Sequence, residues 1–226
     1  MATYKQISGF NIKSLATDPS NLLKGEIWYN STSGTLKVAP LVGTWVSGNN
    51  LNTARYGGAS SGIETAALLS GGNAWGPADS PTGATEEFDG TNWTTSPGTL
   101  NTPRYSQGGF GIQTSSVITG GDNRPPGSAT LTTTETYDGT SWTAGTAYPI
   151  AGTNASGFGT TAAGVIAGGG TGPSPTGTTT TTDYASGTWT AGGALPLLRR
   201  WSGTAGTLTA GLIFLGQTPP NVMANT

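Results

Sequence analysis

The sequence repeats itself with a period of just under fifty residues, and no other feature restricts its fold so strongly. Four tryptophans mark the period, because they fall 48, 49 and 47 residues apart and each ends a short phrase that begins Gly-Thr. They are Trp45, Trp93, Trp142 and Trp189. A period of this length is typical of repeat architectures, in which each copy forms one small unit that buries its apolar side against its neighbours.

Each copy contains the same elements in the same order. A Gly-rich segment leads into an apolar run that stops at glycine, at residues 66–72, 116–121, 163–169 and 212–216. A Thr/Glu-rich strand that ends in an aromatic residue comes next, at residues 86–88, 135–137 and 182–184. A tight turn such as Asp89-Gly90 then leads to the next tryptophan. Short apolar runs bounded by glycine favour buried strands, and Asp-Gly favours hairpin turns. We therefore expect about four antiparallel strands in each copy.

A repeat of about fifty residues, with an apolar run, a Gly-Gly pair and then a spaced Tyr and Trp, resembles the kelch motif. The resemblance implies an all-β fold, a kelch-like β-propeller of about four four-stranded antiparallel blades. Three blades are expected at about residues 51–98, 99–147 and 148–194.

The fourth blade is incomplete in the C-terminal part of the sequence, because residues 195–226 supply only its first two strands. Residues 25–50, which contain a hairpin pattern and Trp45, could supply the other two. We therefore expect one composite blade of residues 25–50 and 195–226, which would protect both sheet edges. The alternative is an open or oligomeric arrangement in which neighbouring copies complete each other's partial blade.

Composition argues against several classes of function. The 226 residues carry a net charge of -2 and only 9% charged side chains, so we expect no binding to nucleic acid and no membrane insertion. No histidine and no cysteine occur, which removes the commonest base and metal ligands, and we expect no cofactor and no enzymatic activity. Glu86 and Glu87 are adjacent on a strand and point to opposite faces, so we interpret them as a solvated edge.

The segment Gly25–Val38, followed by Trp45, resembles a hairpin phrase of phage tail fibres and related virion proteins. Asp18-Pro19 and the phrase Leu51–Arg55 are similar to virion proteins of marine bacteriophages, especially cyanophages. The resemblance implies a virion structural protein, such as a tail fibre, tail appendage or baseplate component. It would assemble in the host cytoplasm, in several copies or as a homo-oligomer, with other virion proteins. The alternatives are a lectin-like protein that binds host surface glycan for attachment and a capsid decoration protein.

Candidate contact residues lie in the non-periodic segments. The irregular loops after the glycine pairs should gather on one face of a ring of blades, and they contain Trp75, Asp79, Arg124, Pro125 and Pro173. Residues 1–24 form a predicted docking arm whose apolar residues are Tyr4, Ile7, Phe10 and Ile12. The alternative is that this arm packs against the propeller itself. The periodic residues are interpreted as architectural. The four tryptophans would lie between blades. One arginine recurs in every copy except the third, as Arg55, Arg104 and Arg200.

Overall fold

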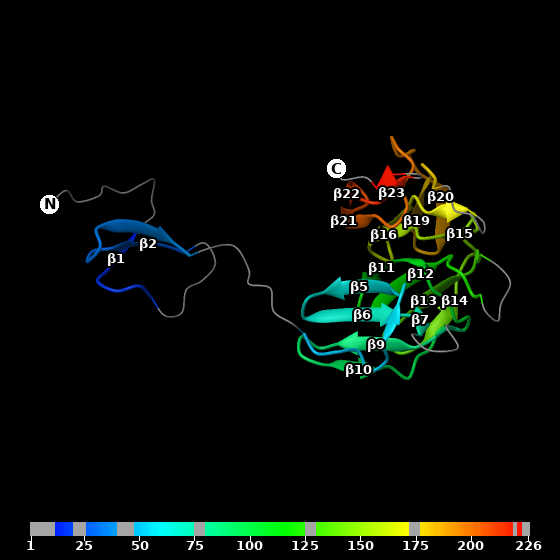
Figure 1. The fold of residues 1–226 in the computed structure, drawn as a ribbon, viewed down its shortest axis with the longest axis horizontal. Helices are drawn as coiled ribbons and strands as arrows, with labels where there is room; N and C mark the ends of the chain where they lie inside the picture. The colour runs from blue at the N-terminus through cyan, green and yellow to red at the C-terminus, as the bar shows by residue number, and fades with distance from the viewer. Residues whose placement is uncertain are drawn as a thin grey trace. The chain divides into compact units, whose positions relative to one another are not determined.

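A computed structural model describes residues 12–19, 26–39, 48–74, 80–124, 130–171, 177–218 and 221–222 (Figure 1). Every regular element among these residues is a β-strand. None of them belongs to a helix that is long and apolar enough to span a membrane. The chain divides into two compact units, Met1–Ser47 and Gly48–Thr226. The predicted docking arm and the predicted hairpin both belong to the first unit.

The first unit contains a three-stranded sheet in the order β1-β2-β3. Its strands are β1 (Lys13–Leu15), β2 (Ile27–Asn30) and β3 (Thr35–Val38). The strands β2 and β3 are antiparallel, and Gly34, at a φ of 69°, closes the turn between them. The hairpin predicted at residues 25–38 is therefore confirmed. The strand β1 pairs with β2 in the parallel direction.

The second unit contains three four-stranded antiparallel sheets, each formed by one copy of the repeat. The first sheet consists of β5 (Ala59–Ile63), β6 (Ala66–Ser70), β9 (Thr85–Phe88) and β10 (Trp93–Thr95). The second consists of β11 (Gly108–Ile112), β12 (Ser115–Thr119), β13 (Thr134–Tyr137) and β14 (Trp142–Ala144). The third consists of β16 (Ser156–Gly159), β17 (Gly164–Ala167), β19 (Thr181–Ala185) and β20 (Thr188–Ala191). The predicted apolar and Thr/Glu-rich strands are thus confirmed.

The fourth sheet has two strands, β21 (Gly203–Thr207) and β22 (Ala210–Phe214). They correspond to the first two strands of the other sheets, as the sequence predicts. The expected donation of outer strands by residues 25–50 stays a prediction, since residues 40–47, including Trp45, lie outside the described residues.

Short strands pair with one another outside these four sheets. The strand β7 (Asn73–Ala74) pairs with both β4 (Arg55–Tyr56) and β8 (Ser80–Pro81). In the third repeat β15 (Gly152–Thr153) pairs with β18 (Gly170–Thr171). The last pair is β23 (Gln217–Thr218) with β24 (Asn221–Val222).

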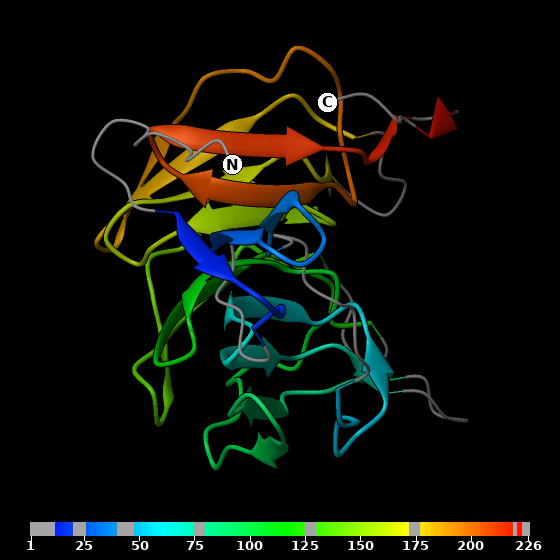
Figure 2. The ribbon, with the colours of Figure 1, turned by 90° about the vertical axis from the view of Figure 1, so that its left-hand side faces the viewer.

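The innermost strands of the second unit, β5, β11, β16 and β21, lie next to one another in that order. Figure 2 shows the orange and red strands β21 and β22 beside the yellow-green strands of the third sheet. Glycine permits this close approach, because a Cβ on Gly157 would lie 2.3 Å from the carbonyl oxygen of Gly109 on the neighbouring strand.

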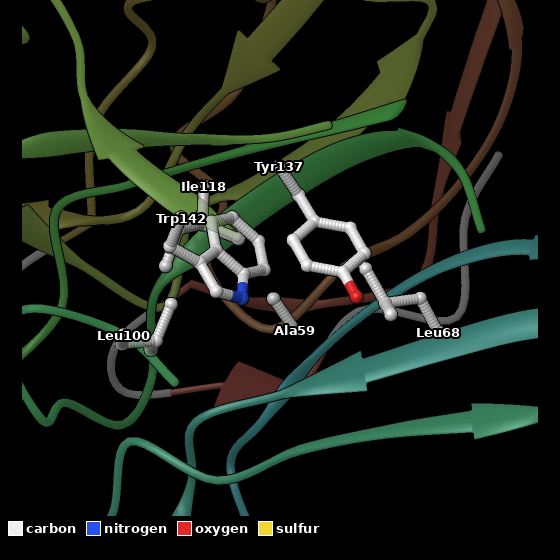
Figure 3. Close-up of a cluster of buried hydrophobic side chains, with 6 residues drawn as sticks. All are labelled: Ala59, Leu68, Leu100, Ile118, Tyr137 and Trp142. Carbon is white, nitrogen blue, oxygen red and sulfur yellow. The ribbon is translucent and has the colours of Figure 1, made fainter. Parts of the chain in front are cut away.

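Apolar side chains between neighbouring sheets form the core. The cluster between the first two sheets brings the rings of Tyr137 and Trp142 against Leu68, Ala59, Leu100 and Ile118 (Figure 3). Trp142 also donates its indole N–H to Thr85 Oγ1 at 2.9 Å. A second cluster between the second and third sheets contains Phe110, Val117, Tyr148, Ile166 and Tyr184, with Trp189 packed against it. Trp93 stacks on Phe88 of its own sheet, with ring centroids 5.1 Å apart.

Two of the periodic arginines form buried ion pairs. Arg55 Nη1 lies 2.6 Å from Glu86 Oε1, and Arg104 Nη2 lies 2.7 Å from Glu135 Oε1. The interpretation of Glu86 as part of a solvated edge is wrong, because this residue is only 1% exposed and also accepts a hydrogen bond from the backbone N–H of Asn52. Glu87 points to the other face, where it accepts a hydrogen bond from the Tyr137 hydroxyl at 2.5 Å.

In the fourth repeat the structural equivalent of Arg104 is Arg199 and not Arg200. The second glycine of each pair donates its N–H to the backbone carbonyl of the equivalent residue in the next repeat. The acceptors are Arg104, Gly152 and Arg199. Arg199 is also buried, and its guanidinium donates to the carbonyl of Leu215, much as Arg104 donates to Gly120. Spacing from the tryptophan alone could not separate two adjacent arginines. The guanidinium of Arg200 instead lies 4.4 Å from the ring centroid of Trp201.

Candidate functional site

Most of the contact residues predicted from the sequence lie outside the described residues. In the loops these are Trp75, Asp79, Pro125 and Pro173, and in the arm they are Tyr4, Ile7 and Phe10. Ile12 is described and is half-buried in the first unit. Of the predicted loop residues, Arg124 has described contacts.

Arg124 is held by its own loop. Its guanidinium forms a salt bridge with Asp122, and Nε lies 2.8 Å from Oδ1 and 2.9 Å from Oδ2. Burial raises the pKa of the Asp122 carboxyl, but hydrogen bonds from the side chain and backbone of Arg124 outweigh it and hold the pKa below its usual value. The charge of Arg124 is thus largely neutralised, which favours a role in ordering the loop.

A different feature recurs in register just before the inner strands of the second unit. The second residue before each inner strand has a positive φ: 68° at Gly57, 57° at Ser106, 60° at Asn154 and 53° at Trp201. Each N–H donates to the carbonyl of the preceding member of the series, at 2.6, 2.7 and 3.0 Å. A continuous row of backbone hydrogen bonds therefore crosses all four repeats. Glycine adopts this conformation without cost, whereas a bulky residue such as tryptophan is strained.

This row borders a cavity of about 590 Å³. The lining consists of the residues that lead into the four inner strands: 56–58, 105–107, 154–156, Trp201 and Ser202. The loops that follow the glycine pairs begin beside it, because Tyr56 pairs with Asn73, Tyr105 with Asp122, and Thr153 with Gly170. The cavity and the first described residues of these loops therefore lie at the same end of the strands.

The lining combines aromatic rings with neutral polar groups. Tyr56 and Tyr105 are in edge contact, with ring centroids 6.4 Å apart at 68°. Asn154, Gln107 and three serines supply amide and hydroxyl groups, and none of the lining residues carries a charged side chain. Two lining residues have a buried polar atom without a hydrogen-bond partner, Gln107 Oε1 and Ser202 Oγ. Such atoms call for an explanation, of which an entering water or ligand is the simplest.

Sequence reasoning missed this cavity. Its signal was faint, because Gly57, Ser106 and Asn154 are ordinary turn residues, and only the register of the inner strands shows that Trp201 occupies the same position. Among the described residues, no group of three or more His, Cys, Asp or Glu side chains is placed to hold a metal ion.

Comparisons with known proteins establish the fold and no more. No protein-family model matches the sequence, and a search of curated proteins gives no significant match. Among solved structures, the chain is similar to the one described as "Structure of YjhT", with a TM-score of 0.66 at 11% identity. The similarity covers 88% of this chain and 70% of that chain. At this identity it supports the arrangement of strands and carries no information on function.

Proposed function

We propose that this chain is a non-enzymatic structural protein of a bacteriophage particle, such as a tail fibre, tail appendage or baseplate component, that assembles with other virion proteins. In this proposal residues 25–226 form a kelch-like propeller of four blades. The likeness of the hairpin phrase and of the repeat to phage virion proteins supports the viral assignment.

The observation that supports assembly is an apolar face left uncovered on the last sheet. One position of the second strand faces the next sheet in every repeat. Its occupant is buried in the first three, with 1% exposure for Leu68, 0% for Val117 and 6% for Val165. In the fourth, Leu212 is 52% exposed. The strand β22 also lacks the third strand that pairs with β6, β12 and β17 among the described residues.

An edge strand with unpaired backbone groups and an exposed leucine is a template for another polypeptide segment. The segment proposed from the sequence is residues 25–50, either of the same chain or of a neighbouring copy. The alternative is that a segment of another virion protein pairs with β22.

The test of the viral assignment is a reconstruction of the phage particle that encodes this chain, with an antibody fragment against the second unit as a label. We expect the label at defined, symmetric positions on the tail or baseplate. Purified infectious particles that contain none of this chain by mass spectrometry would overturn the assignment.

The second candidate is a lectin-like protein that binds host surface glycan, and a cavity lined by aromatic rings and neutral polar groups favours it. Purified protein should then bind host polysaccharide, and Trp75→Ala should weaken that binding. A protein that binds virion partners and no host polysaccharide rules out this candidate and leaves the assembly role intact.

A further inference from the structure

From the lining of the central cavity we infer that it is a binding site for one uncharged sugar ring. The inference gives the glycan-binding candidate a site and a ligand class, and it rests on that candidate and not on the assembly role. It depends on three properties of the cavity, which are its aromatic surfaces, its unpaired polar atoms and its neutrality.

The aromatic surfaces come from three of the four repeats. Tyr56 and Tyr105 form one edge-to-face pair, and Trp201 is 58% exposed with the guanidinium of Arg200 on its ring. The C–H face of a pyranose is apolar and packs on such rings, which supply a large contact area at little conformational cost. A rim with three rings is more than the packing of the fold requires, since Trp201 is buried against no core cluster.

Polar groups that suit sugar hydroxyls also line the cavity. Gln107 is only 6% exposed, and its amide nitrogen donates to the carbonyl of Ser70 at 2.8 Å while Oε1 accepts from no protein group. Ser202 Oγ is likewise buried without a partner. An amide oxygen of this kind can accept a hydrogen bond from a sugar hydroxyl, and a serine hydroxyl can both donate and accept one. Leaving them unpaired destabilises the folded chain.

Neutrality selects the class of sugar. The lining itself contains no Lys, Arg, Asp or Glu, and the one guanidinium described beside it, that of Arg200, packs on the Trp201 ring. A uronic or sialic acid would therefore lose the hydration of its carboxylate with no charged lining residue to replace it. A neutral hexose exchanges hydrogen bonds with water for hydrogen bonds with amides and hydroxyls.

The backbone at Trp201 gives independent support. Gly57 fills the equivalent position at no conformational cost, yet Trp201 is kept there at a φ of 53°. Backbone strain of this kind destabilises the folded chain and concentrates at ligand-binding sites. A tryptophan that is strained, exposed and placed at a cavity rim is better explained by binding than by stability.

The experiment titrates the full chain with the methyl glycosides of glucose, galactose and mannose, and with glucuronic acid as the charged probe, by ligand-observed NMR. We expect at least one neutral glycoside to bind, and glucuronic acid to bind at least about tenfold more weakly.

In Trp201→Gly the dissociation constant of the neutral glycoside should rise at least about tenfold. The thermal midpoint of unfolding should be unchanged or higher, because glycine relieves the backbone strain. The matched control is Ile63→Gly, which removes another exposed apolar side chain at the opposite end of an inner strand, and it should leave binding unchanged.

Three outcomes overturn the inference. They are binding of no neutral glycoside, preference for glucuronic acid, and neutral binding that Trp201→Gly leaves intact. If host polysaccharide still binds in any of these cases, the glycan-binding candidate survives and only the site or its ligand class is wrong.

Discussion

At the scale of single residues, the third repeat lacks a whole interaction of the second and not just one of its side chains. Arg104 and Glu135 are both buried and form an ion pair. In the third repeat the equivalent positions hold Gly152 and Thr182, as the hydrogen bonds of the glycine pair and the strand registers show. Both charges are thus replaced together. Losing only one would leave an uncompensated buried charge, which destabilises a protein by several kcal/mol.

We therefore expect Glu135→Gln to lower the free energy of unfolding by about 3 kcal/mol, because Arg104 stays buried without its counter-charge. Urea unfolding followed by tryptophan fluorescence measures the effect. Asp183→Asn is the matched control, since it makes the same acid-to-amide change on the corresponding strand of the third sheet at a half-buried position, and it should cost less than about 0.5 kcal/mol. Equal losses in the two variants would contradict the importance of the ion pair.

Asp18 gives the first unit a pH-dependent contact. Its carboxylate accepts hydrogen bonds from Lys37 at 2.6 Å, Asn30 at 2.7 Å and the Trp28 indole at 3.0 Å. These bonds, that from Lys37 above all, lower the pKa of Asp18 from 3.8 to about 2. A depressed folded-state pKa contributes stability that is present above pH 3.8 and is lost as the pH falls through about 2.

In an NMR titration, the Trp28 indole N–H resonance should therefore shift with an apparent pKa near 2. Asp18→Asn should abolish this transition, because the amide does not titrate. A transition near 3.8, the ordinary value, would show that the carboxylate is not held in this way.

At the scale of the elements, the Gly-Gly pair connects one repeat to the next. The first glycine has a φ of 63°, 68° and 68° in the first three repeats, at Gly71, Gly120 and Gly168. A Cβ there would lie 2.5–2.7 Å from a backbone carbonyl of the following repeat. In the fourth repeat Leu215 takes this place at a φ of 58° and is exposed. Among the four repeats, the glycine is replaced only in the fourth.

Two substitutions at equivalent positions should therefore differ in effect. Gly168→Ala combines a strained φ with a clash against the Arg199 carbonyl and should destabilise the protein by at least about 2 kcal/mol. Leu215→Gly relieves strain and removes little buried surface, so the free energy of unfolding should change by less than about 1 kcal/mol. Thermal and urea unfolding of the two variants provide the measurement. A loss for Leu215→Gly as large as that for Gly168→Ala would mean that Leu215 is packed like its counterparts.

The strands with apolar side chains could be predicted from the sequence, because β6, β12, β17 and β22 are short runs that end at glycine. The third strands were also identifiable from their terminal aromatic residues. The inner strands were not assigned residue by residue, since segments such as Gly108–Ile112 are rich in glycine, which has a low strand propensity. They are strands because their small residues permit close packing of neighbouring backbones. The cavity was missed for the same reason, as its lining follows from the register of those strands.

At the scale of the whole molecule, the uncovered ends of the second unit decide how the repeat closes. The inner strands are adjacent from β5 to β21, and contacts between β5 and β21 are not among the substantial ones of the described strands. Burying an exposed leucine such as Leu212 contributes about 1.5–3 kcal/mol, and pairing of β22 adds its backbone hydrogen bonds. Completion of the last sheet is therefore favourable, whichever segment supplies the strand.

Cysteine crosslinking can identify that segment, because the chain contains no native cysteine. We predict that a variant with Val38→Cys and Leu212→Cys, treated with a short bifunctional thiol reagent, forms a link within one chain, as expected for a composite blade of residues 25–50 and 195–226. Both side chains are exposed among the described residues.

The matched control pairs Val38→Cys with Ile63→Cys. Ile63 is exposed to a similar degree but lies on a sheet that already has four strands, so this pair should crosslink far less. Denaturing electrophoresis distinguishes the outcomes, because an internal link changes mobility without doubling the mass. Covalent dimers in place of internal links would mean that neighbouring copies complete each other. Equal yields from the two pairs, or no link in the first, would contradict strand donation by residues 25–50.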